Sequence, residues 1–306
     1  MTGPDRVAQF EADIAASPDA LTRLLDGWRP VDLGGRQRVA VIGLGSSRYA
    51  GLIAVSALRA RGTSAWVEFA SSSSPTAPGP DLAVLAVSAS GRTLEVVHAA
   101  ERHRGRSLVV ALTNDPDSPL AGAADLVIPL AAGEETAGIA SRTYRATIAA
   151  LALLTGLSTP DALRPAVTRM AARHAARSAW APPFVDALDR AAAIDVVADA
   201  SLLGLAEQAA LMLREAPRLP ARAHDTGEWL HTGVYLALPG HRVVLVPGAA
   251  ADAEVIATVE RRGGRAVRVE PSRDEDPIRR ALEESIVAEV VAAGLWSRAE
   301  AIDKGA

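Results

Sequence analysis

Two segments rich in hydroxyl side chains follow short apolar stretches of the sequence. Segment 43–47 reads GLGSS and segment 88–93 reads SASGRT, and we expect each to join the end of a buried strand to the start of a helix. The free N–H groups and dipole of a helix N-terminus favour an anion, and serine and threonine hydroxyls add short neutral donors. Both segments therefore predict a phosphate site, although these residue types are also common in turns and N-caps.

The pattern around the first segment disfavours the common nucleotide sites. Position 48 is Arg48 where the dinucleotide fingerprint requires its third glycine, and no acidic residue ends the following strand to bind a ribose. A P-loop needs a lysine after its glycines, whereas Lys304 is the only lysine of the chain. A site that holds a single phosphate group with hydroxyls suits a sugar phosphate, so we expect a sugar phosphate as the ligand.

The elements expected to position these segments alternate between strands and helices. Short, non-alternating apolar strands are predicted at 38–45, 64–70, 81–88, 107–114 and 125–131, and again at 194–200, 242–248 and 265–271. Such strands, separated by helical patterns, are typical of parallel sheets covered on both faces. The second half repeats the first, which indicates a tandem duplication. We expect a helical arm (1–37), a first domain (38–160), a helical connection (161–192) and a second domain (193–306).

Composition limits the functions that this chain can have. Its 306 residues are 49% hydrophobic and suit about two domains, and the basic residues are scattered in a chain of net charge −4, so we expect no nucleic-acid partner. No apolar stretch reaches the roughly 18 residues that span a bilayer and no signal pattern opens the chain, so we expect no membrane association and a cytoplasmic protein. The absence of cysteine excludes disulfides and thiolate chemistry. No metal-ligand spacing is present, and we expect neither a metal nor a cofactor.

Three segments resemble the phosphosugar-binding elements of the SIS (sugar isomerase) domain. They are GLGSSRYAG, SASGRT and AGEETAGIASRTY (132–144), and the likeness is to the double-domain form found in the isomerase half of glucosamine-6-phosphate synthase. The resemblance implies an α/β fold of two tandem SIS-type three-layer αβα units with parallel, flavodoxin-like sheets, related by duplication. It also implies phosphate contacts from Ser47, Ser88, Ala89, Ser90 and Thr93, and sugar contacts from Gly45, Ser46, Ile139, Ala140, Ser141 and Lys304. A disordered C-terminal end is the alternative for Lys304.

The second half carries a candidate acid–base pair. The segments EQAALMLREA and AHDTGEWLHTG resemble the catalytic helix of that family and the loop after it, with Glu215 and His231 as catalytic residues. Proton transfer between adjacent sugar carbons needs a carboxylate of raised proton affinity, and the helix end before Pro217 disfavours the charge of Glu215. An imidazole after a turn can open the sugar ring. The alternatives are a solvated carboxylate paired with Arg214 or Arg218, and an ordinary loop histidine.

Nearby titratable groups compete with this pair. These are Glu207, His224 and Glu228, of which Glu228 is expected to stabilise a turn, while His98, His103 and His174 are expected at the surface.

The resemblance leaves several functions open. The synthase has a glutaminase domain with a cysteine nucleophile, which this chain lacks, and Met212 and Gln208 replace its helix lysine and glutamate. Glu and His without that lysine also resemble stand-alone SIS deglycases of 6-phosphofructosamines, and would serve an aldose–ketose isomerase or an amino-sugar phosphate deaminase. A sensor that only binds a sugar phosphate is the remaining alternative. In the family the histidine enters the neighbouring subunit's pocket, which implies a homodimer with His231 supplied across the interface.

Overall fold

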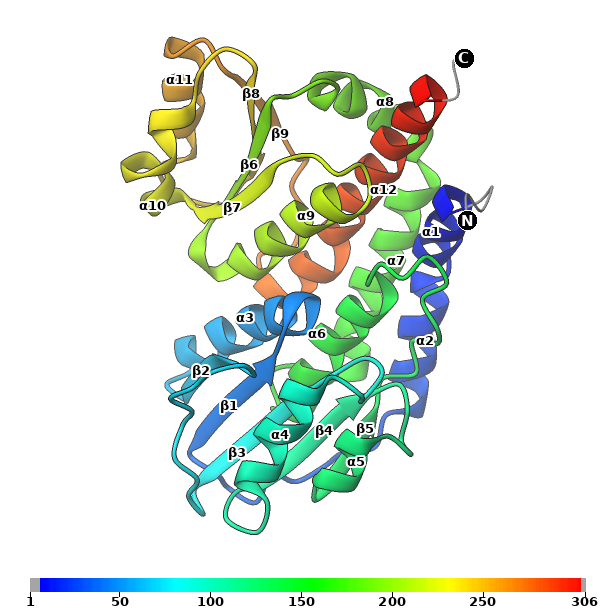
Figure 1. Cartoon of the computed structure of the whole chain (residues 1–306), viewed down its shortest axis with the longest axis vertical. Coiled ribbons are helices and arrows are strands. Elements are labelled where there is room, and N and C mark those ends of the chain that lie inside the picture. The colour runs from blue at the N-terminus through cyan, green and yellow to red at the C-terminus, as the bar shows by residue number, and fades with distance from the viewer. Residues whose placement is uncertain (1–5, 304–306) are drawn as a thin grey trace. The chain divides into compact units, whose positions relative to one another are not determined.

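The computed structural model describes residues 6–303 and contains two compact units (Figure 1). The N-unit comprises Ala16–Glu134 and Ala140–Val167, and the C-unit comprises Met1–Ala15, Glu135–Ile139 and Thr168–Ala306. Each unit combines segments that are distant in the sequence, so the units do not correspond to the continuous domains expected from the sequence. The domain boundaries given above stay predictions.

The N-unit is built on a five-stranded parallel sheet of order β2-β1-β3-β4-β5. Its strands are β1 (Arg38–Gly43), β2 (Ser64–Phe69), β3 (Leu82–Val87), β4 (Leu108–Thr113) and β5 (Leu126–Pro129). Its helices are α2 (Ser17–Gly27), α3 (Gly45–Ala60), α4 (Leu94–His103), α5 (Pro119–Ala123) and α6 (Arg142–Leu154), and α7 (Pro160–Ala175) continues from it into the C-unit. All six residues of β3 are buried, as expected for a strand covered on both faces.

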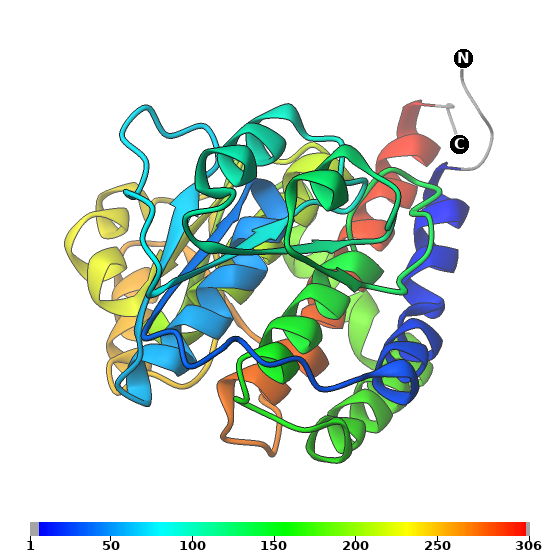
Figure 2. The same ribbon diagram turned by 90° about the horizontal axis from the view of Figure 1, so that it is seen from below.

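Helices cover both faces of this sheet. Figure 2 shows α4 and α5 on one side of the strands and α3 and α6 on the other. Helix α3 approaches the sheet closely at Gly51, where a Cβ atom would lie 2.7 Å from Cγ1 of Val41. The three-layer arrangement predicted for the first half is therefore confirmed.

The C-unit repeats the arrangement with a four-stranded parallel sheet of order β7-β6-β8-β9. Its strands are β6 (Ala193–Ala198), β7 (Ala221–Asp225), β8 (His241–Val246) and β9 (Arg265–Arg268). Its helices are α1 (Arg6–Ala15), α8 (Arg177–Leu188), η1 (Ala200–Leu202), α9 (Leu203–Glu215), α10 (Thr226–His231), η2 (Gly233–Leu236), α11 (Asp252–Arg261) and α12 (Pro277–Asp303). Helices α10 and α11 cover one face of this sheet, and α9 and α12 cover the other (Figure 1).

Sequence and structure differ at one strand. Eight strands lie where they were predicted, but β7 occupies part of a segment that we expected to form a loop. Its sequence ARAHD carries no apolar run, because β7 is an edge strand paired only with β6. The polar side chains of β7 surround a buried carboxylate, which is described below.

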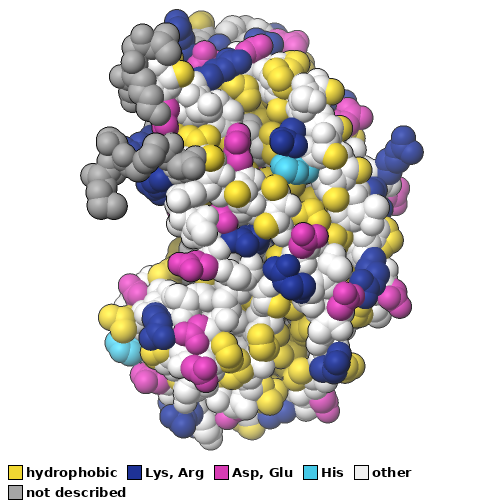
Figure 3. All heavy atoms as spheres, turned by 90° about the vertical axis from the view of Figure 1, so that its right-hand side faces the viewer, with side chains coloured by type: hydrophobic (Ala, Val, Ile, Leu, Met, Phe, Trp, Pro, Cys, Tyr) yellow, Lys and Arg dark blue, Asp and Glu magenta, His cyan; other side chains and the backbone are white. Residues whose placement is uncertain are grey.

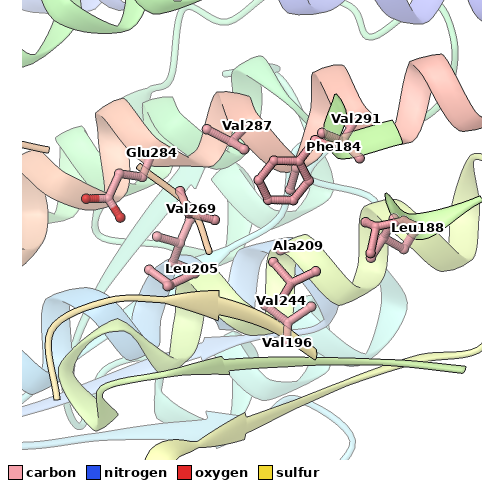
Figure 4. A pocket seen from close by; sticks show the side chains of 13 residues that line it. Phe184, Leu188, Val196, Leu205, Ala209, Val244, Val269, Glu284, Val287 and Val291 are labelled. Carbon is pink, nitrogen blue, oxygen red and sulfur yellow. The ribbon is translucent and has the colours of Figure 1, made fainter. Parts of the chain in front are cut away.

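A small cavity lies under the C-unit sheet, between β6, β8, α9 and α12 (Figure 4). Its volume is about 30 Å³, and it is lined by valine, leucine, alanine and phenylalanine side chains with Glu284 at one end. An apolar cavity of this kind offers too few polar partners to hold a water molecule.

Charges are mixed on the face drawn in Figure 3, where arginine and acidic side chains are interspersed. Within residues 6–303, no helix is both long enough and apolar enough to cross a membrane.

Candidate functional site

The two hydroxyl segments lie at neighbouring positions on one edge of the N-unit sheet. Strands β1 and β3 are paired in parallel, with Ile42 opposite Ala86, so both strands end at the same edge. The strand order reverses between β1 and β3, and ligands of open α/β sheets bind at such a switch point. Segments 43–47 and 88–93 therefore occupy the position where this fold class binds a ligand.

Both segments lead into helices whose first N–H groups have no side-chain cap among the described residues. Helix α3 begins at Gly45 and α4 begins at Leu94, and neither N-cap side chain accepts a hydrogen bond. In contrast, Ser118 caps helix α5 by accepting a bond from the N–H of Ala121. Two uncapped N-termini side by side favour an anion in front of them.

The hydroxyls of the second segment converge in part. Ser88 Oγ lies 3.0 Å from Thr93 Oγ1, and Ser88 is buried whereas Thr93 is half-buried. Ser90 is exposed, and its hydroxyl accepts a bond from the N–H of Arg92. Ser47 lies in the first turn of α3 and is half-buried. Thr93 and Ser47 are thus accessible in part, while Ser88 reaches a ligand only at the floor of the segment.

Gly91 fixes the shape of this segment. Its φ is +64°, and a Cβ atom there would lie 2.0 Å from Ser118 Oγ. Its carbonyl accepts a bond from the N–H of Leu120, and the carbonyl of Ala89 accepts bonds from the N–H of Asn114 and from Thr113 Oγ1. Sequence reasoning did not single out these supporting residues, although the polar end of the fourth predicted strand, ALTN, was a signal for them.

The predicted sugar-contacting residues have different environments. Gly45 is exposed, Ser46 and Ala140 are half-buried, and the side chains of Ile139 and Ser141 are buried. In this conformation, Ile139 and Ser141 can therefore contact a ligand only through their main-chain atoms. Lys304 lies outside the described residues.

Glu215 is the last residue of α9 and has no salt bridge with another described residue. Arg214 instead donates to the carbonyl of Ala221 at 2.8 Å. The residue is exposed, as the alternative of a solvated carboxylate requires, but partial desolvation of its carboxyl group raises the pKa of Glu215, and the positive charge of Arg214 opposes this shift only in part. A carboxylate with raised proton affinity is what a general base near neutral pH requires.

His231 is the last residue of the short helix α10 and is exposed. The N-cap of the helix is Asp225, whose side chain accepts bonds from the N–H groups of Gly227 and Glu228. Glu228 is exposed in the first turn, where a negative charge suits the helix dipole. His231 therefore ends a helix and does not follow a simple turn.

The position where the resembled family carries a lysine is buried in this chain. Met212 is fully buried, and Gln208, 1% exposed, donates from Nε2 to Met212 Sδ at 3.6 Å. An amine for Schiff-base chemistry is therefore absent here, and the space is filled by packing.

The corresponding edge of the C-unit sheet has a different arrangement. Strands β6 and β8 pair at its switch point, but the side chain of Asp252 accepts bonds from the N–H groups of Gly248 and Ala249, at 2.7 and 3.2 Å. A protein carboxylate thus takes the hydrogen bonds that an anionic ligand would need. No group of three His, Asp or Glu side chains within the described part of the chain could hold a metal ion.

Comparison with known proteins places these features in context. Residues 33–156, which hold β1 to α6, match the SIS domain. Glutamine–fructose-6-phosphate aminotransferase (isomerizing) of Aeropyrum pernix is 31% identical over 237 residues, which cover 69% of this chain and 37% of that protein. The chain thus spans about a third of the length of the curated relatives that it matches.

Solved structures show the same fold over nearly the whole chain. A protein of Silicibacter pomeroyi DSS-3 has a TM-score of 0.78 at 22% identity and covers 97% of this chain and 98% of its own. Tagatose-6-phosphate ketose/aldose isomerase of Escherichia coli has a TM-score of 0.78 at 16% identity, covering 95% and 92%. The α/β fold with two parallel sheets is confirmed, and the SIS resemblance is confirmed for residues 33–156.

Proposed function

We propose that this chain is a sugar-phosphate enzyme of the aldose–ketose isomerase or deglycase type, and that its second half is a further SIS-type unit. The observation that carries the proposal is the pair of uncapped helix N-termini, with hydroxyls around them, at the switch point of the N-unit sheet. These groups bind the phosphate of a ketose 6-phosphate or an amino-ketose 6-phosphate.

Glu215 and His231 carry out the proton transfers in this proposal. His231 protonates the ring oxygen, which opens the sugar, and Glu215 takes the proton from C1. His231 donates a proton to the C2 oxygen as the enediol, or the enaminol for an amino-ketose, forms. Glu215 then returns its proton to C2, and the C1 oxygen or nitrogen gives a proton back to His231. The raised pKa of Glu215 supports the role, because the same group must accept and return the proton.

The deglycase variant adds a hydrolytic step. The enaminol of a 6-phosphofructosamine takes the proton at C2 and becomes the imine of an aldose phosphate. Water then adds to the imine carbon and the amine leaves. The buried Met212 supports this branch over one that needs a lysine amine on the same helix.

We further propose that the active species is a homodimer in which His231 enters the partner's site. Support comes from three exposed apolar side chains that closely follow His231. Tyr235, Leu236 and Leu238 are 69%, 47% and 52% exposed, and large apolar side chains gathered in one segment favour an interaction surface.

A sensor that binds a sugar phosphate without turnover is the second candidate. It is favoured by the replacement of the helix lysine with a buried methionine while both hydroxyl segments are retained.

Turnover separates the two candidates. The chain is incubated with fructose 6-phosphate, glucosamine 6-phosphate and a phosphorylated fructose–amino acid, and glucose 6-phosphate and free amine are measured. We expect product from the wild type, binding without product from Glu215→Gln, and weakened binding from Ser88→Ala. The matched controls are Glu228→Gln on α10 and Ser56→Ala, a serine in the second half of α3, away from the N-terminus that carries Ser47. Binding without product in the wild type would favour the sensor.

A further inference from the structure

A carboxylate without contact to solvent lies in the middle of the C-unit sheet. Asp195 on β6 is fully buried, and its Oδ2 accepts a hydrogen bond from Trp229 Nε1 at 3.0 Å. Nε2 of His241 lies 3.1 Å from the same oxygen, while Arg222 and His224 approach Oδ1 to 3.1 and 3.7 Å. A buried charge persists only when such partners surround it.

The partners of Asp195 come from both neighbouring strands, β7 and β8, and from helix α10. Arg222 is paired with Asp195 in the strand register, and His224 lies two residues further along β7. His241 begins β8, and Trp229 belongs to α10, which covers this face. Burial alone would raise the pKa of Asp195, but the groups of His224, His241 and Trp229 outweigh it and hold the pKa well below its usual range. Asp195 is therefore a fixed negative charge on the side of the sheet that faces α10.

Trp229 is the main attachment of α10 to the sheet. A helix of six residues is not stable on its own, and α10 buries only Thr226 and Trp229. Thr226 Oγ1 donates to the carbonyl of Ala198 at 3.0 Å. The indole ring lies under Gly233, where a Cβ atom would come within 2.4 Å of Trp229 Cδ1. The orientation of α10 therefore depends on the indole, and the indole N–H depends on Asp195.

We propose that Asp195 is a positioning residue that acts through Trp229 to hold α10, and with it His231, in place. This inference rests on the proposed function, because it gives His231 a catalytic role. Because His231 is exposed, packing of its own side chain does not fix its position. It stands only two residues after Trp229, so the anchoring of Trp229 fixes it instead. A carboxylate buried one layer below thus determines where an exposed imidazole lies.

The first test measures anchoring without reference to catalysis. Hydrogen exchange is followed in peptides covering residues 226–236 of Asp195→Asn and Trp229→Phe. Trp180→Phe is the matched control, because the Trp180 indole also donates a hydrogen bond, to the carbonyl of Arg173, in the same unit. We expect faster exchange in α10 for the first two variants only. Unchanged protection in both would overturn the inference. Trp229→Phe keeps the ring, so it remains informative if Asp195→Asn does not fold.

The second test uses turnover. We expect Trp229→Phe and Asp195→Asn to lower kcat about 10- to 100-fold with little change in KM, because small displacements of a catalytic group have effects of this size. Combining either variant with His231→Asn should add nothing to His231→Asn alone. A further loss in the double variant would overturn the inference. Full activity of His231→Asn would instead refute the proposed role of His231, and the catalytic part of this inference with it, even where exchange in α10 is faster.

Discussion

Gly91→Ala tests the close contact between segment 88–93 and Ser118. The substitution puts a Cβ atom on a residue with φ of +64°, 2.0 Å from Ser118 Oγ and 2.4 Å from Ser118 Cβ. Ser118 cannot move away freely, because its hydroxyl caps α5 through the N–H of Ala121. The segment that carries Ser88 and Thr93 must therefore shift.

Two effects of Gly91→Ala are expected to lower the free energy of unfolding. Holding alanine in the left-handed region costs about 1–2 kcal/mol. Overpacking against Ser118 costs about 1–3 kcal/mol more. Gly105→Ala is the matched control, because Gly105 has φ of +71° but no atom within 4 Å of a built Cβ atom, so only the first cost applies. Gly91→Ala should therefore be less stable than Gly105→Ala by about 1–3 kcal/mol, which lowers the melting temperature by a further ~2–12 °C.

Thermal unfolding by circular dichroism gives the stability difference, and calorimetry with fructose 6-phosphate at low temperature gives the affinity. We expect Gly91→Ala alone to bind more weakly, because its hydroxyls are displaced. Equal melting temperatures for the two variants would show that Ser118 does not lie against Gly91.

Three further results are expected. Partial desolvation raises the pKa of Glu215, so its charged form destabilises the fold, but the residue is exposed and solvent screens the effect. Glu215→Gln should therefore increase the free energy of unfolding in urea at pH 8 only slightly, with a gain that fades as pH falls to 4.5 and vanishes below it. Burial lowers the pKa of His103, a residue that is buried and not at the surface as predicted, so stability should fall as pH drops below 6.5. His103→Gln should flatten this dependence, and His98→Gln on the exposed side of α4 should not. Val244→Ile adds a methyl group toward the cavity of Figure 4 and should stabilise the fold by up to about 1 kcal/mol. Val243→Ile lies on the opposite face of the same strand, which is fully packed, and should destabilise the fold by about 1–3 kcal/mol. Melting temperatures that change equally for both valines would contradict the cavity.

The parts of the fold that could be predicted are those in which local sequence and tertiary burial agree. The strand at 82–87 is buried along its whole length, so an uninterrupted apolar run identifies it and the hydroxyls after it. The strand at 221–225 escaped prediction because its polar residues serve Asp195, which lies 27 residues before Arg222 in the sequence and opposite it in the sheet. Such a dependence has no local pattern. The contact between Gly91 and Ser118 was hidden for the same reason.

The side chain of Asp252 has a consequence for titrations. The strand order reverses beside β1 in one sheet and beside β6 in the other, so each sheet has a switch point. Strand order alone would therefore suggest two equivalents of phosphate ester bound per polypeptide. The C-unit edge already supplies its own negative charge, and a competing anion would have to displace a tethered carboxylate. Saturation should therefore occur at one equivalent per polypeptide.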